Sequence, residues 1–129
     1  MKNKISILAI LFCLIITLGC AVILIGAGAG AGTYAYLNGE LKRAYEAKYD
    51  RTVKACTDAL RSLKITINEK TSDSIKTVLN AKRSDGTKVT VKAVKIEQNV
   101  TEVSVRTGVV GLWDKQTSMQ IHESIKKRL

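Results

Sequence analysis

In 76-KTVLNAKRSDGTKVTVKA-93, apolar and polar residues alternate on both sides of a turn signal, and this segment carries most of the information about the fold. Such alternation is typical of strands that bury one face, and Asp85-Gly86 between the two halves predicts a hairpin. A two-residue turn would direct lysines into the core. We therefore expect a three-residue loop that ends at a left-handed Gly86 and places Leu79 opposite Val91.

Further strands are expected on both sides of this hairpin. A first strand is expected around Gly39, and alternating apolar positions predict two others, at Ile65 and Ile67 and at Val103 and Val105. The apolar positions change from odd to even at Ala93-Val94, which predicts a β-bulge at that point.

Two helices are predicted from spacings of three and four residues. The first begins at Asp50, its expected N-cap, and its apolar stripe is Tyr49, Val53, Cys56, Leu60 and Leu63. The second begins near Asp114, also an expected N-cap, and carries Ile121, Ile125 and Leu129 on one stripe. Cys56 lies within the first stripe, so we expect a buried thiol and no disulfide.

These elements predict an α+β domain over residues 36–129. Its antiparallel sheet would have about four or five strands with two helices on one face, in the order strand, helix, strands, helix. The other face would then meet water and carry Lys82, Lys88 and Lys92.

The amino-terminal segment predicts export. Lys2 and Lys4 precede an uncharged stretch that lasts until Glu40. An apolar run over residues 5–18, followed by Gly19, is typical of a secretory signal, and Cys20 comes next. A cysteine in this place is typical of a bacterial lipoprotein, whose thiol takes up a diacylglycerol, although residues 17–20 match the usual signal imperfectly. We expect a signal peptide over 1–19 and a lipidated Gly/Ala-rich tether over 20–35.

An uncleaved anchor is the alternative for this segment. Residues 5–25 would form about 31 Å of helix, which is enough to cross a bilayer core of about 30 Å. Either arrangement leaves the lysines in the cytoplasm and places the carboxy-terminal domain across the membrane.

Charge and aromatic residues suggest what the exported domain contacts. The chain of 129 residues has 21 Lys and Arg against 11 Asp and Glu, a net charge of +10. Export and the lack of regularly spaced aromatic residues argue against nucleic acid. The expected partner is an anionic envelope component or a protein, met by a contact surface of Lys82, Lys88, Lys92 and Trp113. Trp113 either closes the core or forms an exposed apolar patch with Val109 and Leu112.

No catalytic set is predicted. His122 is the only histidine and lies next to Glu123, on a helix whose core stripe is Ile121 and Ile125. The sequence gives no reason to place the Cys, Ser or carboxylate partners of a triad or a metal site near its ring. Residues 26–32 match a dinucleotide fingerprint formally, but no helix-forming pattern or downstream acidic residue completes a βαβ unit. We expect no enzyme activity, no cofactor and no metal site.

Several motifs together resemble a known family. They are Gly19-Cys20, the glycine-alanine tether, Tyr36-x-x-Gly39-Glu40-Leu41, Tyr49-Asp50, Asp85-Gly86-Thr87 and Thr101-Glu102-Val103-x-Val105-Arg106-x-Gly108. The pattern is similar to a family of small Gram-negative bacterial lipoproteins catalogued as a domain of unknown function. The resemblance implies a lipid-anchored envelope protein that carries fatty acyl groups such as palmitate and faces the periplasm. Ala21 in place of Asp favours the outer membrane over the inner one.

The leading hypothesis is a non-catalytic binding or structural module held at the membrane by the lipid on Cys20. A small lipid-handling protein or enzyme of the cell envelope is one alternative. A single-pass protein with an uncleaved amino-terminal helix is the other.

Overall fold

The computed structural model describes residues 2–7, 9–10 and 34–129, which belong to two separate units. In the amino-terminal unit, residues 2–7 and 9–10 are helical. Cys20, most of the predicted signal peptide and almost all of the tether lie outside the described residues. Within the described parts of the chain, no helix combines the length and the hydropathy that a membrane span needs.

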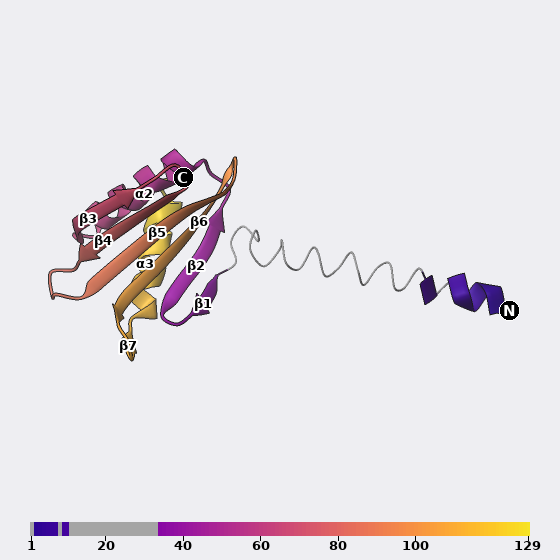
Figure 1. Cartoon of the computed structure of the whole chain (residues 1–129). Coiled ribbons are helices and arrows are strands. Elements are labelled where there is room, and N and C mark those ends of the chain that lie inside the picture. The colour runs from indigo at the N-terminus through magenta and orange to yellow at the C-terminus, as the bar shows by residue number, and fades with distance from the viewer. Residues whose placement is uncertain (1, 8, 11–33) are drawn as a thin grey trace. The chain divides into compact units, whose positions relative to one another are not determined.

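The carboxy-terminal unit is an antiparallel sheet with two helices (Figure 1). Its elements in chain order are β1 (Ala35–Leu37), β2 (Glu40–Tyr45), α2 (Tyr49–Ser62), β3 (Thr66–Ser72), β4 (Lys76–Lys82), β5 (Lys88–Glu97), β6 (Val100–Val109), β7 (Leu112–Trp113) and α3 (Lys115–Lys126). The strands lie in the order β1-β2-β6-β5-β4-β3, and β7 pairs with β6.

The predicted sheet of four or five strands was wrong, because this sheet has seven. Two of the strands are too short to show any periodicity: β1 has 3 residues and β7 has 2. The single strand expected around Gly39 is a hairpin, β1–β2, in which Asn38 (φ 52°) and Gly39 (φ 79°) form the turn. Asn-Gly is a strong signal for such a turn, so the hairpin could have been predicted from Asn38-Gly39.

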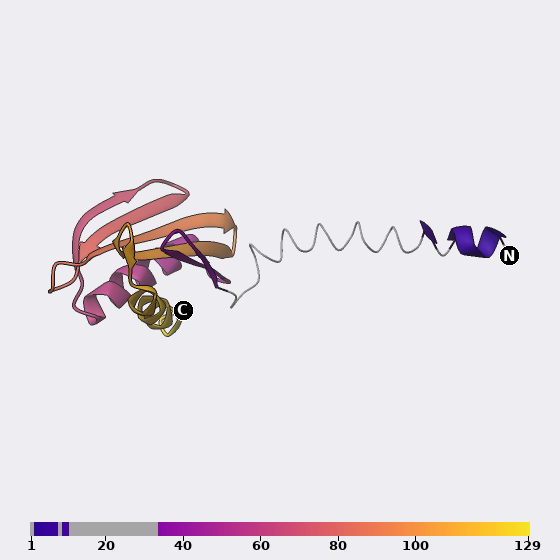
Figure 2. The same ribbon diagram turned by 90° about the horizontal axis from the view of Figure 1, so that it is seen from below.

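Both helices lie on the same side of the sheet (Figure 2). The core between them and the sheet contains Val53, Cys56, Leu60, Leu79, Val89, Val91, Val103, Val105, Ile121 and Ile125. The prediction of a buried Cys56 is confirmed: it is a free thiol with 1% of its surface exposed, and burial raises its pKa to about 12.

The central hairpin has the predicted register. Leu79 pairs with Val91 and Ala81 with Val89, and Gly86 has a φ of 89°. The predicted β-bulge at Ala93-Val94 was wrong, because β4 and β5 pair regularly through Val94. The register shift lies between Lys95 and Glu97. Ala93 still faces the core while Val94 is half-buried on the other face, so no correction of register is needed between them.

One of the two predicted helix caps is confirmed. Asp114 is the N-cap of α3, and its side chain accepts a hydrogen bond of 2.9 Å from Thr117 N. Asp50 is not the N-cap of α2, which is the extended Lys48. The carboxylate of Asp50 lies in the first helical turn instead, where a negative charge suits the helix dipole.

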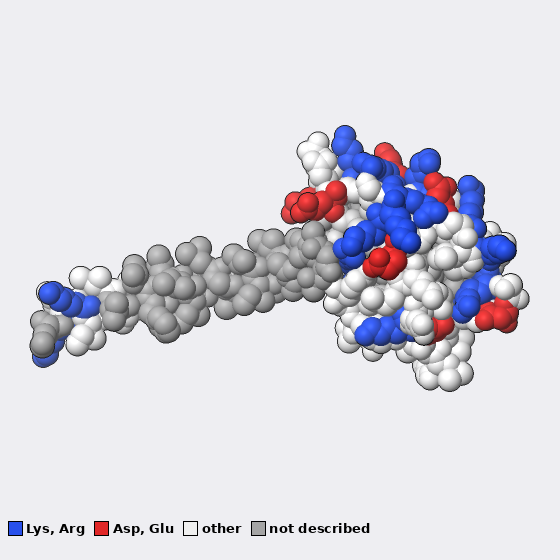
Figure 3. All heavy atoms as spheres, turned by 180° about the vertical axis from the view of Figure 1, so that it is seen from behind, with Lys and Arg blue, Asp and Glu red and all other residues white. Residues whose placement is uncertain are grey.

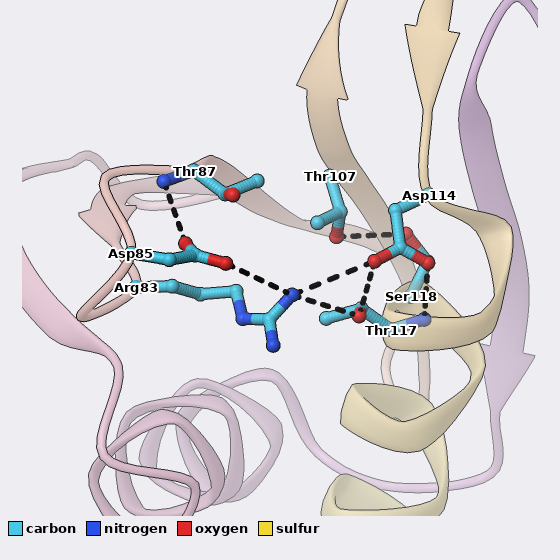
Figure 4. A network of polar contacts seen from close by, with 7 residues as sticks. All are labelled: Arg83, Asp85, Thr87, Thr107, Asp114, Thr117 and Ser118. Carbon is cyan, nitrogen blue, oxygen red and sulfur yellow. Dashed lines mark hydrogen bonds and ion pairs between the residues drawn. The ribbon is translucent and has the colours of Figure 1, made fainter.

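A polar network connects the β4–β5 hairpin to the start of α3 (Figure 4). The guanidinium Nη1 of Arg83 lies 3.3 Å from Thr117 Oγ1, 3.5 Å from Asp114 Oδ2 and 3.8 Å from Asp85 Oδ2. Hydrogen bonds from the side chain and the backbone N–H of Thr117 lower the pKa of Asp114. The network therefore holds the hairpin and the amino-terminal end of α3 together at one end of the sheet.

Candidate contact surface at one end of the sheet

The outer face of the sheet, opposite the helices, is mostly polar. Cross-strand pairs place Glu40 beside Arg106, Arg106 beside Thr90, and Thr90 beside Asn80 on this face. Lys92 lies between Ser104 and Val78 in the next row. Since the apolar residues of the same strands point toward the helices, polar residues are left to line the outer face.

Lys82 and Lys88 form a directly opposed pair on β4 and β5. Both side chains are exposed, and neither makes an ion pair with any described residue. Like charges directly opposite each other destabilise a sheet. A hollow of about 320 Å³ adjoins the pair and is lined by Asn68, Asn80, Ala81, Lys82, Lys88, Val89 and Thr90. A bound anion would offset the repulsion between the two ammonium groups.

Lys92, which sequence analysis grouped with these lysines, has a different environment. Its Nζ lies 3.2 Å from Glu40 Oε1, and Arg106 and Lys42 approach the same carboxylate at 3.7 and 3.8 Å. The Glu40 side chain is only 14% exposed. One carboxylate is thus shared by three cations, so this group keeps a positive charge, but Lys92 is less available to a partner than Lys82 or Lys88.

Trp113 joins two hairpins instead of closing the core. Its indole ring lies against Gly39, where a Cβ atom would overlap the ring. The Arg106 guanidinium lies 5.3 Å from the centre of the ring. The ring is half-buried and is not part of the core cluster. The expectation that Trp113 closes the core was therefore wrong.

The residues around Trp113 form an exposed group, here named the apolar tip, that consists of Leu37, Val109, Val110 and Leu112. Their exposed fractions are 69%, 50%, 87% and 76%. The exposed patch predicted as one alternative contained Val109 and Leu112 but neither Val110 nor Leu37. The Asn38-Gly39 turn signal would have placed Leu37 at the end of a hairpin.

His122 is a core residue whose two ring nitrogens both lie within hydrogen-bond distance of groups in β2. It is fully buried, with Nε2 2.8 Å from the Leu41 carbonyl oxygen and Nδ1 2.8 Å from Tyr45 Oη. Because a carbonyl can only accept, Nε2 carries the proton and Nδ1 accepts from the tyrosine. Burial lowers the pKa of His122 to about 4 and raises that of Tyr45. The imidazole is therefore neutral and out of reach of a substrate in solution.

The helix side of the domain also carries cations. Figure 3 views this side and shows Lys and Arg spread over it with acidic residues between them. An open groove of about 650 Å³ between α2 and β3 has Ile65, Ile67 and Leu79 at its base, with Arg61, Lys64 and Lys70 also lining it. Within the described residues, no three His, Cys, Asp or Glu side chains come together as a metal site would require.

Comparison with models of known protein families identifies the family of the chain. A family model described as "Protein of unknown function (DUF3568)" matches residues 4–128. The chain belongs to this family. No curated protein matches it. The resemblance to a domain family of unknown function is thereby confirmed, while the match to DUF3568 itself establishes nothing about lipidation.

We expect the stability of this DUF3568 domain to depend on the protonation of His122. Between pH 6.5, the usual pKa, and about 4, the unfolded chain binds a proton that the folded chain excludes. The free energy of unfolding should therefore fall by roughly 3 kcal/mol as the pH drops through this window. Chemical denaturation at a series of pH values, with His122→Gln as the comparison, measures this contribution. Parallel pH profiles for the two proteins would contradict it.

Gly39→Ala should disturb the junction beneath Trp113. Both Gly39 and Gly86 have positive φ, so alanine at either costs about 1–2 kcal/mol of backbone strain. Only the Cβ at position 39 meets the indole ring, whereas the space around Gly86 is open. We expect Gly39→Ala to lower the free energy of unfolding more than Gly86→Ala and to shift Trp113 fluorescence toward that of exposed indole. Equal losses with unchanged emission would show that the ring does not depend on Gly39.

Proposed function

We propose that the chain is a lipid-anchored protein of the bacterial cell envelope, attached by a diacylglycerol on Cys20 and facing the periplasm. The basic start, the apolar run and Gly19-Cys20 support this proposal. The family match begins at residue 4 and continues through the apolar segment into the folded domain. Both parts are therefore matched as one unit. The residue after the cysteine, Ala21, favours the outer membrane.

The domain is proposed to act as a non-catalytic binding module for an anionic envelope component. The opposed pair of Lys82 and Lys88 is the observation that carries this proposal. A phosphate group beside both ammonium groups would turn a repulsive pair into two charge-assisted hydrogen bonds. Asn80 and Thr90 line the same hollow, although the Asn80 amide already donates to Glu69 Oε2 at 3.2 Å.

The intact mass of protein extracted from membranes tests the anchor. We expect the mass of a mature chain that begins at Cys20 and carries a diacylglycerol. Two acyl chains would hold the protein at the membrane stably, whereas one would hold it only marginally. Cys20→Ser should abolish both the processing and the added mass. A full-length, unmodified mass would instead establish an uncleaved anchor over residues 5–25 and place the protein in the inner membrane.

Substitution of the lysine pair tests the contact surface. The test is a titration of inorganic phosphate into the full chain in zwitterionic detergent. NMR spectroscopy would follow the amide resonances of residues 82, 88 and 80. Lys82→Gln/Lys88→Gln should weaken binding about tenfold, the equivalent of about 1.4 kcal/mol. The same variant should be no less stable, because the substitution removes a like-charge pair.

Lys126→Gln/Lys127→Gln is the matched control, because it removes two exposed lysines from the carboxy-terminal end of α3. Unchanged phosphate binding in the Lys82/Lys88 variant would contradict the contact surface.

The groove between α2 and β3 supports a second candidate function in lipid handling. Its apolar base and its cations match the two ends of an anionic amphiphile. Titration with a short-chain fatty acid in the same detergent would then perturb Ile67 and Lys70 instead of Lys82 and Lys88.

A further inference from the structure

The apolar tip is unusual for a surface that meets only water. Leu37, Val109, Val110 and Leu112 come from two different hairpins, and each is at least half exposed. Trp113 connects them, because it follows Leu112 in β7 and its ring lies on Gly39 beside the β1–β2 turn. Large apolar side chains that are exposed together at one end of a domain mark a contact with another molecule or with a membrane.

Cations lie around this group at the same end of the sheet. Figure 1 shows the β1–β2, β4–β5 and β6–β7 turns at one end. Lys82 and Lys88 flank the β4–β5 turn, and Lys115 Nζ lies 5.0 Å from the centre of the Tyr36 ring. These three lysines make no ion pair with any residue in the described part of the chain, whereas Asp85 and Asp114 are both engaged by Arg83.

Trp113 lies at the base of the apolar tip, between apolar and charged groups. Leu112 precedes it toward the tip, and Arg106 covers its ring on the side of the sheet. Tryptophan prefers the boundary between acyl chains and head groups, and lysine and arginine prefer the phosphates above it. The order of apolar tip, indole ring and cations matches the order of layers at a lipid surface.

We propose that the apolar tip inserts into the head-group region of an anionic phospholipid surface, with Trp113 at the interface and Lys82, Lys88 and Lys115 on lipid phosphates. This inference rests on the proposed function and names the anionic component as phospholipid. The β6–β7 turn suits insertion, because Val109 and Leu112 pair across it and Asp114 N donates to Thr107 O at 2.9 Å. The backbone N–H and C=O groups that pair β6 with β7 therefore enter the head-group region already hydrogen-bonded.

The single tryptophan of the chain makes insertion measurable. The full, membrane-extracted chain is reconstituted into vesicles of phosphatidylcholine, with or without an equal part of phosphatidylglycerol. A portion of the phosphatidylcholine carries bromine near the carbonyl end of its acyl chains. Flotation reports attachment through the anchor, and bromine quenching of Trp113 reports insertion. We expect strong quenching in vesicles that contain phosphatidylglycerol and weak quenching in those that do not.

Val110→Asp/Leu112→Asp should reduce the insertion equilibrium roughly tenfold or more, because two apolar side chains no longer enter the lipid. Both side chains are exposed, so the domain should keep its fold. Val110→Asp alone, at a residue that is 87% exposed, is a less severe substitution that should weaken insertion to a smaller extent. Ile75→Asp is the matched control, because Ile75 is 56% exposed but lies in the β3–β4 turn, at the opposite end of β4 from Lys82. This control should be quenched as strongly as the unmodified chain.

Three results would overturn the inference while leaving the anchor in place. They are a chain that floats with vesicles without quenching of Trp113, quenching that persists in Val110→Asp/Leu112→Asp, and equal quenching with and without phosphatidylglycerol. Self-association in detergent that the tip variant abolishes, without quenching by lipid, would assign the apolar tip to a second copy of the chain and also overturn it. A chain that does not float would remove the proposed anchoring and the inference together.

Discussion

Burial of one face of the sheet beneath α2 and α3 determines which side chains of the domain meet solvent. Side chains alternate along each strand, so the positions that place Leu79 and Val91 in the core also place Lys82 and Lys88 on the other face. A slip of one residue between β4 and β5 would exchange the two sets. The left-handed Gly86 fixes the register. The chemistry of one turn therefore decides where positive charge lies on the surface.

The outer face accommodates its cations in two different ways. Glu40 neutralises part of the charge of Lys42, Lys92 and Arg106, because the β2–β6–β5 order brings these residues around one half-buried carboxylate. Among the described residues, no carboxylate pairs with Lys82 or Lys88 in this way. The nearest acidic residue in the turn, Asp85, accepts from Thr87 N and lies beside Arg83 instead. Part of the unpaired positive charge thus lies at the end of the sheet that also carries the apolar tip.

Sequence reasoning located part of this surface and could not locate the rest. Lys82 and Lys88 were placed on one face because the hairpin between them is local, and register follows from parity and loop length. The role of Trp113 was not accessible, because its contact with Gly39 joins residues far apart in the chain. The same holds for His122, whose partners Tyr45 and Leu41 belong to β2. A lone histidine has no local signal that distinguishes a catalytic group from a buried hydrogen-bonded one.

Features that depend on neighbours along the chain could be predicted from the residues alone. These are the alternating strands, the β4–β5 loop, the buried stripe through Cys56, the Asp114 cap and the apolar start of the chain. Three features depend on the packing of the whole domain: the number of strands, the sharing of Glu40 by three cations and the joining of the β1–β2 and β6–β7 hairpins by Trp113. The reason is physical. Periodicity records which face of an element is buried, but strand order and contacts between distant hairpins arise when the whole sheet packs against its helices.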